Sequence, residues 1–194
     1  MSPRAGLHQK MIIETAAEIA DQEGINGVTL AALSKKMNVR PPSLYNHISG
    51  LQGIRTELAV SGLTRLFDQM ADSVKEQKGE SALLSLGDAY VGFAVENPGY
   101  YEATLLKIQD ERAESLSNQI VRLVTKLLID SGYANEQTVI HATRGLRSLL
   151  HGFATLIGKE AFELKEDISD SLAFSIRLFL SGLSINNKSI MQTK

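Results

Sequence analysis

The stretch VTLAALSKKMNVRPPSLYNHI, from Val28 to Ile48, decides the fold of this chain. Thr29 can cap the start of a helix, because its hydroxyl accepts a hydrogen bond from the free amides of the first turn. Asn38 tolerates positive φ and can end that helix. Two consecutive prolines fit only at the start of a second helix, predicted over residues 41–48. The pattern is typical of a helix-turn-helix or of an ordinary αα-hairpin.

Three segments of this stretch resemble the N-terminal domain of the tetracycline repressor-like (TetR) family of transcription regulators. They are Thr29–Leu33, Asn38–Val39 and Ser43–Ile48, within a resemblance that runs from about Pro3 to Leu66. The sequence departs from the family at Asn38, where most members have glycine, and at Leu51, where many carry a lysine that approaches a phosphate. The resemblance implies that double-stranded DNA is the partner of this stretch.

Polar side chains around the predicted second helix are the candidates for DNA contact. Arginine can bind guanine through two hydrogen bonds, asparagine can bind adenine, and serine serves several base edges. The candidates for base readout are Arg40, Pro42, Ser43 and Asn46. The resemblance implies phosphate contacts by Tyr45 and His47, and we expect further backbone contacts from Thr29 and Lys36. Arg4 lies in a predicted flexible arm, and we expect it to reach into the minor groove. A solvated polar face is the alternative interpretation.

The rest of the chain shows helical spacing and no useful β pattern. The predicted helices cover residues 8–22, 51–76, 81–96, 100–108, 111–131, 136–159 and 169–183, with a polar tail after them. We therefore expect an all-α fold of about nine helices. Residues 1–50 would form a DNA-binding domain and residues 51–194 a ligand-binding and dimerisation domain. The helix over 51–76 is expected to be the only link between the two.

Two further segments extend the resemblance into the second domain. Asn97–Tyr101 and Leu150–Phe153 are similar to landmarks of a TetR subgroup with a His-Gly motif. In that family the domain binds a small molecule and dimerises through its last two long helices. The candidate pocket residues are Tyr90, Phe93, Tyr100, Tyr101, Arg147 and His151. The candidate dimer residues are Leu150, Phe153, Ile157, Phe174 and Leu178. Plain core packing is the alternative for the aromatic residues, and ion pairs with Glu160 or Glu163 are the alternative for Arg147.

Composition narrows the possible functions. The chain has 194 residues, a net charge of −2 and 43% hydrophobic residues, so it can build a core and is not broadly basic. It has no cysteine, and its four histidines show no metal-binding spacing, so we expect no metal and no cofactor. Since no apolar run reaches membrane-spanning length and no signal peptide is evident, we expect a cytoplasmic protein. Phosphate-binding and catalytic motifs are absent from the sequence, which argues against an enzyme.

Together these features predict a homodimeric DNA-binding transcription regulator. We expect a repressor of a palindromic operator that a small organic effector releases. Two alternatives stay open at this point: a helical module that binds protein instead of DNA, and a constitutive regulator without a ligand.

Overall fold

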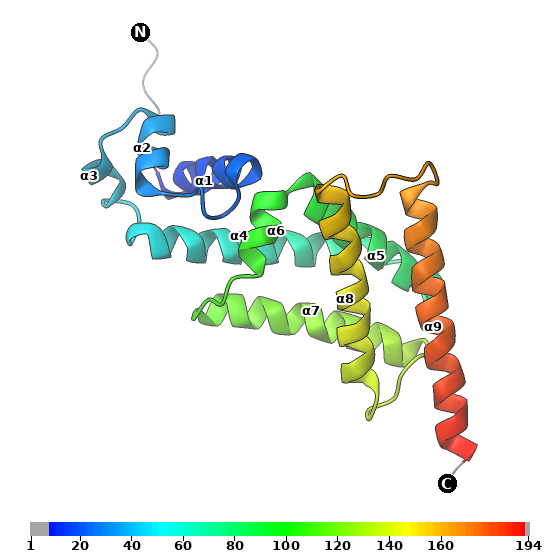
Figure 1. The fold of residues 1–194 in the computed structure, drawn as a ribbon. Helices are drawn as coiled ribbons and strands as arrows, with labels where there is room; N and C mark the ends of the chain where they lie inside the picture. Colours follow the sequence, from blue (N-terminus) through cyan, green and yellow to red (C-terminus); the bar gives the residue numbers. More distant parts are fainter. Residues whose placement is uncertain (1–7, 193–194) are drawn as a thin grey trace. The chain divides into compact units, whose positions relative to one another are not determined.

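The computed structural model of the chain describes the backbone of residues 8–192 and the side chains of residues 8–184. Over residues 8–192 it has nine α-helices and no β-strand, so the predicted all-α fold is confirmed (Figure 1). The helices are α1 Gln9–Glu23, α2 Leu30–Met37, α3 Pro41–Leu44, α4 Gly50–Ser73, α5 Gly79–Glu96, α6 Pro98–Thr104, α7 Glu111–Asp130, α8 Val139–Gly158 and α9 Ile168–Gln192. None of the described helices combines the length and hydropathy that a membrane span requires.

The chain divides into two compact units. Unit 1 consists of the residues up to 65 and residues 97–116, and unit 2 consists of residues 66–96 and those from 117 onward. Helices α4 and α7 contribute to both units, because each of them crosses a boundary. Helix α6 belongs entirely to unit 1, together with α1, α2 and α3.

The helix-turn-helix of unit 1 forms as its sequence predicts. The Thr29 hydroxyl caps α2 by accepting a hydrogen bond from the Ala32 amide at 3.0 Å. Asn38 ends α2 in the left-handed conformation, with φ 52°. Leu44 and Ile48, four residues apart, are both buried in the core. The local signals of the sequence therefore fix both the turn and the inward face of this segment.

The second helix of the pair is shorter than predicted. Helix α3 covers only Pro41–Leu44, and residues 45–47 form a turn instead of continuing the helix to residue 48. The two prolines occupy the first two positions of α3, where the missing amide hydrogens cost no hydrogen bond within the helix. The His47 amide then bonds the Leu44 carbonyl at 2.9 Å, three residues back, as in a 3₁₀ turn. The segment is one helical turn followed by a tight turn.

Helix α6 packs directly on α1 within unit 1. The Asp21 carboxylate accepts a hydrogen bond from the Gly99 amide at 2.7 Å, and the Glu102 carboxylate accepts one from the Ile25 amide at 2.7 Å. A Cβ added at Gly99 would lie 2.6 Å from the Ala20 Cβ. The expectation that α4 alone joins the first helices to the later ones is therefore wrong. The hydrogen bonds of this second link join residues that lie 77 and 78 positions apart in the sequence, so local sequence patterns do not reveal it.

Unit 2 is formed around close contacts of α5 with α8 and α9 and of α8 with α9. A Cβ added at Gly87 of α5 would lie 2.5 Å from the Ile176 Cδ1, so glycine allows α9 to approach α5 closely. Gly145 of α8 has the same role toward Phe179 of α9, at 2.8 Å. In Figure 1, α8 (yellow) and α9 (orange to red) run beside each other.

Among the later helices, the largest differences from the predicted ends are those of α6, α8 and α9. Helix α6 covers residues 98–104 instead of 100–108, since Pro98 occupies its first position. Helix α8 starts at residue 139 instead of 136, because the Asn135 side chain accepts from the amides of Gln137 and Thr138 and holds a turn there. Helix α9 continues to residue 192, since residues 184–192 contain no glycine or proline that would end it.

Candidate nucleic-acid interface

The predicted DNA-contacting side chains that the structure describes lie in the helix-turn-helix segment of unit 1, and most of them are exposed. Those that are exposed are Thr29, Lys36, Arg40, Pro42, Tyr45, Asn46 and His47, and Ser43 is half-buried. All of them belong to α2, α3 or the residues that flank these helices. Arg4 lies outside the described residues. The structure therefore brings eight of the nine candidates into one short segment.

Arg40 and Tyr45 flank α3 on either side. The Arg40 side chain is exposed, makes no capping hydrogen bond to α3, and has no carboxylate partner within the described part of the chain. A guanidinium without an internal partner is available for two hydrogen bonds to a base or a phosphate. Tyr45 is 58% exposed, so its ring is not part of the core of unit 1. Both side chains are thus available to a partner.

The two candidates on α2 differ in their availability. The Thr29 hydroxyl oxygen accepts from the helix, so its hydrogen remains available to a phosphate at the positive end of the helix dipole. The Lys36 ammonium lies 3.1 Å from the Glu18 carboxylate of α1, and a phosphate would compete with that pair. Lys35 is exposed and forms no ion pair among the described residues. The sequence alone does not show which of these two lysines is paired, because the position of Glu18 depends on how α1 packs.

Known proteins identify the family of this chain. The family model described as tetracyclin repressor-like, C-terminal domain, matches residues 83–179. Over 98% of its length the chain is 76% identical to the whole of YobS, an uncharacterized helix-turn-helix-type transcriptional regulator of Bacillus subtilis. The chain belongs to the TetR family. It is accordingly a DNA-binding transcriptional regulator, and the predicted family is confirmed.

Solved structures share the fold of this TetR regulator. A protein of unknown function from Rhodococcus sp. RHA1 matches with a TM-score of 0.79 and 18% identity, over 95% of this chain and 100% of that one. A TetR variant from Acinetobacter baumannii, solved in complex with minocycline, matches with a TM-score of 0.65 and 15% identity, over 91% and 96% of the two chains. At these identities the likeness concerns the fold alone.

The predicted pocket residues of the TetR regulator fall into two groups. Tyr100 and Tyr101 lie on α6 in unit 1, whereas unit 2 holds Tyr90 and Phe93 on α5 and Arg147 and His151 on α8. The four aromatic side chains are buried, His151 is half-buried and Arg147 is exposed. Burial raises the pKa of the Tyr100 hydroxyl.

The alternative ion pairs of Arg147 with Glu160 or Glu163 do not form within the described residues. Over the same residues, no group of three or more His, Cys, Asp or Glu is placed to hold a metal ion.

The predicted dimer residues give unit 2 an exposed apolar surface, which we call the α8–α9 face. Phe174 and Leu178 of α9 are 66% and 62% exposed, while Phe153 and Ile157 of α8 are half-buried. A groove of about 450 Å³ on this face is lined by Leu149, Ser175, Leu178, Phe179, Gly182 and Leu183. Leu150 is only 2% exposed and packs toward α5, so it supports the face from within the subunit.

Proposed function

We propose that this TetR regulator is a homodimeric repressor that binds an inverted-repeat operator and is released by a small organic effector. The observation that carries the dimer is the α8–α9 face, where Phe174 and Leu178 project one helical turn apart beside a groove. A contiguous exposed apolar surface marks an interaction site. The small residues Ser175 and Gly182 in that groove leave room for a second helix. Pairing α8 and α9 of two copies about a two-fold axis would bury this surface in a four-helix arrangement.

The proposed functions are assigned to successive parts of the chain. Residues 1–50 contact DNA, and residues 51–194 dimerise and sense the effector, with 51–65 and 97–116 packed into unit 1 beside the reading helices. A two-fold dimer presents two copies of α3, so the half-sites should lie about one helical turn apart or a multiple of it. Because the operator is chromosomal DNA, we place this activity in the cytoplasm.

Selection of bound duplexes from a random DNA pool tests this function directly. The expected result is a single enriched inverted repeat, which can then be sought in the source genome. Failure to enrich any motif would favour the alternative of a protein-binding helical module. Enrichment of a direct repeat would contradict the two-fold dimer, since a symmetric pair of readers requires symmetric half-sites.

Arg40→Ala and Tyr45→Phe should have different effects on DNA binding. We expect Arg40→Ala to relax the preference at one base position of each half-site, with a loss of about 1–3 kcal/mol for the preferred base. Tyr45→Phe should weaken binding to all sequences alike, because it removes only a phosphate contact. The measurement is the same selection repeated with each variant. An unchanged motif for Arg40→Ala would remove Arg40 from base readout.

The proposed effector site uses those of the predicted pocket residues that belong to unit 2. Tyr90 and Phe93 of α5 would supply apolar contacts, and Arg147 and His151 of α8 would supply polar ones, whereas Tyr100 and Tyr101 belong to unit 1 and stay outside this site. Tyr90 and Phe93 are buried in this structure, so side chains of unit 2 would have to move to admit a ligand. Since the chain has no cysteine, thiol-based redox sensing is excluded, and a largely apolar organic molecule fits these residues best.

A thermal-shift screen of apolar organic compounds, followed by operator binding, tests the release. We expect a compound that stabilises the protein to lower its operator affinity, by roughly 5- to 150-fold for typical allosteric coupling. The operator should weaken binding of that compound by the same factor, because coupling is reciprocal. Tight binding without any change in operator affinity would show that the compound is no inducer. A screen without any hit would favour the constitutive regulator.

A further inference from the structure

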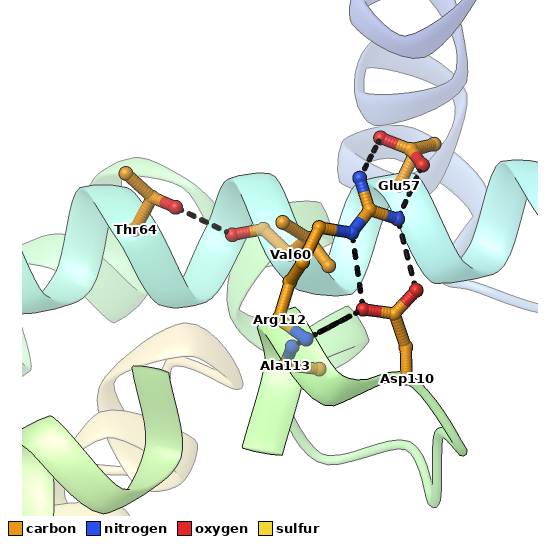
Figure 2. Close-up of polar contacts among 6 residues, drawn as sticks. All are labelled: Glu57, Val60, Thr64, Asp110, Arg112 and Ala113. Carbon is orange, nitrogen blue, oxygen red and sulfur yellow. Dashed lines mark hydrogen bonds and ion pairs between the residues drawn. The ribbon is translucent and has the colours of Figure 1, made fainter. Parts of the chain in front are cut away.

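A cluster of charged side chains joins α4 to the start of α7 inside unit 1 (Figure 2). Arg112 lies between two carboxylates that come from different parts of the chain. Its Nη2 is 2.7 Å from Oε1 of Glu57 on α4 and 2.9 Å from Oδ2 of Asp110. Its Nη1 and Nε lie 3.4 Å and 3.1 Å from the second oxygens of Glu57 and Asp110. The planar guanidinium thus contacts both oxygens of both carboxylates.

Asp110 has a second role in this cluster. Its Oδ1 also accepts hydrogen bonds from the backbone amides of Arg112 at 2.9 Å and Ala113 at 3.4 Å, so it caps the first turn of α7. The hydrogen bonds from Arg112 hold the pKa of Asp110 below its usual value. The same carboxylate therefore fixes the start of α7 and orients the guanidinium toward Glu57. Arg112 thus links Asp110, which caps α7, to Glu57 on α4.

The geometry of the cluster suits it to orient helices. The Arg112 side chain is 55% exposed, and Glu57 and Asp110 are 25% and 19% exposed. A single exposed ion pair contributes little to the free energy of folding, whereas a bidentate arginine in a network of charges contributes more. A forked arginine between two carboxylates also fixes distance and direction in a way that a single charge does not. The cluster can therefore orient α4 relative to the start of α7 in addition to stabilising unit 1.

The cluster lies close in sequence to the DNA-reading helices. Helix α4 begins at Gly50, two residues after the helix-turn-helix segment ends, and Glu57 follows two turns later, about 10 Å along the helix. Ile54 and Leu58, on either side of Glu57 in the sequence, are fully buried. Any rotation of α4 at Glu57 would therefore disturb the core of unit 1. Holding Glu57 in place restricts the rotation of the helix that directly follows the reader.

The connection between α6 and α7 is held differently at its two ends. Residues 105–110 have no helical structure. At the α6 end, buried Gly99 and the bonds of Asp21 and Glu102 fasten the chain to α1. At the α7 end, Arg112 makes side-chain hydrogen bonds to Glu57 of α4. We propose that Arg112 is a positioning residue for DNA binding, which acts through Glu57 to hold α4 and the reading helices in the orientation that binds the operator.

The inference rests on DNA binding by unit 1, and two substitutions separate positioning from simple charge. Arg112→Ala removes a positive charge and Glu57→Gln removes a negative one. Long-range attraction to DNA would make the first variant bind more weakly and the second more tightly. Positioning predicts weaker binding by both, because each breaks the same fork. We expect each Kd to rise roughly 2- to 30-fold, the range that network residues outside a binding site produce.

The probe is the duplex that the wild-type protein selects from a random pool, and Kd is measured by fluorescence anisotropy. The double variant should bind no more weakly than Arg112→Ala alone, since the second change removes nothing further. Arg112→Lys, which keeps the charge without the fork, should resemble Arg112→Ala. Lys126→Ala is the matched control, because it also removes one positive charge by breaking an exposed ion pair, with Asp130 in unit 2, and should leave Kd unchanged.

The selected motif provides a second readout. It should stay the same for Arg112→Ala, since no candidate base-reading residue is altered, while the affinity falls. Opposite shifts for Arg112→Ala and Glu57→Gln, tighter binding by both, or wild-type affinity for both would overturn the proposal. If Arg112→Ala fails to fold, the nearly isosteric Glu57→Gln carries the same test. A wild-type protein that selects no duplex at all would instead count against DNA binding itself.

Discussion

Leu178→Glu is expected to convert the proposed dimer into monomers and to abolish operator binding at concentrations where the wild-type protein is fully bound. Leu178 is 62% exposed on the single chain and borders the groove of the α8–α9 face, so the proposed dimer would bury it. An uncompensated charge buried at such a place costs about 3–5 kcal/mol. Because both subunits would carry it, the two-fold interface would contain two such charges. Light scattering coupled to size exclusion measures the mass, and gel shift measures operator binding.

Val121→Glu is the control for this experiment. Val121 is 40% exposed on α7 in unit 2, so the same change introduces a charge at an exposed apolar position outside the α8–α9 face. This variant should remain dimeric and bind the operator. A dimeric, DNA-binding Leu178→Glu protein would show that the interface lies elsewhere.

Gly99→Ala should destabilise unit 1. A Cβ at this position would lie 2.6 Å from the Ala20 Cβ and 2.8 Å from two backbone atoms of α1, the Ala17 carbonyl oxygen and the Asp21 amide nitrogen. Backbone atoms cannot move aside as a flexible side chain can, so α6 must shift away from α1 and weaken its bonds. We expect a loss of about 1–3 kcal/mol, the usual range for overpacking. Thermal unfolding followed by circular dichroism would show this as a lower midpoint, by roughly 2–4 °C per kcal/mol.

Gly92→Ala is the matched comparison in α5. The added Cβ would meet only the end of the Gln69 side chain, at 3.8 Å. Replacing glycine with alanine in a helix interior normally stabilises it by about 0.5–1 kcal/mol. The midpoint should therefore stay or rise for Gly92→Ala and fall for Gly99→Ala. Equal midpoints for both variants would mean that α6 packs on α1 less tightly than the structure shows.

The parts of this protein that were predictable from its sequence are those fixed by neighbouring residues. Thr29 and Asn38 mark the two ends of α2 through their own side-chain and backbone preferences, and both were identified. The spacing of Leu44 and Ile48 indicated their burial. Even here α3 is shorter than the predicted helix over residues 41–48, because it ends at Leu44 and residues 45–47 form a turn.

The contacts that organise unit 1 were not predictable in the same way. Glu102 and Asp21 look like ordinary surface acids, and their partners are backbone amides 77 and 78 positions away. The partner of Arg112 on α4 is 55 positions away. No spacing rule connects residues so distant, since their meeting depends on how the helices pack. Similarly, the pairing of Lys36 with Glu18 depends on the packing of α1 against α2.

The proline pair that opens α3 has a consequence for the thermodynamics of association. A helix of four residues has little intrinsic stability, because nucleating the first turn is unfavourable. Pro41 and Pro42 have their φ angles fixed by the ring even in the unbound protein. Less backbone entropy is then lost when this segment is immobilised on a rigid double helix. If α3 enters the major groove as proposed, Pro41 and Pro42 would therefore reduce the entropy that this helical turn loses on binding DNA.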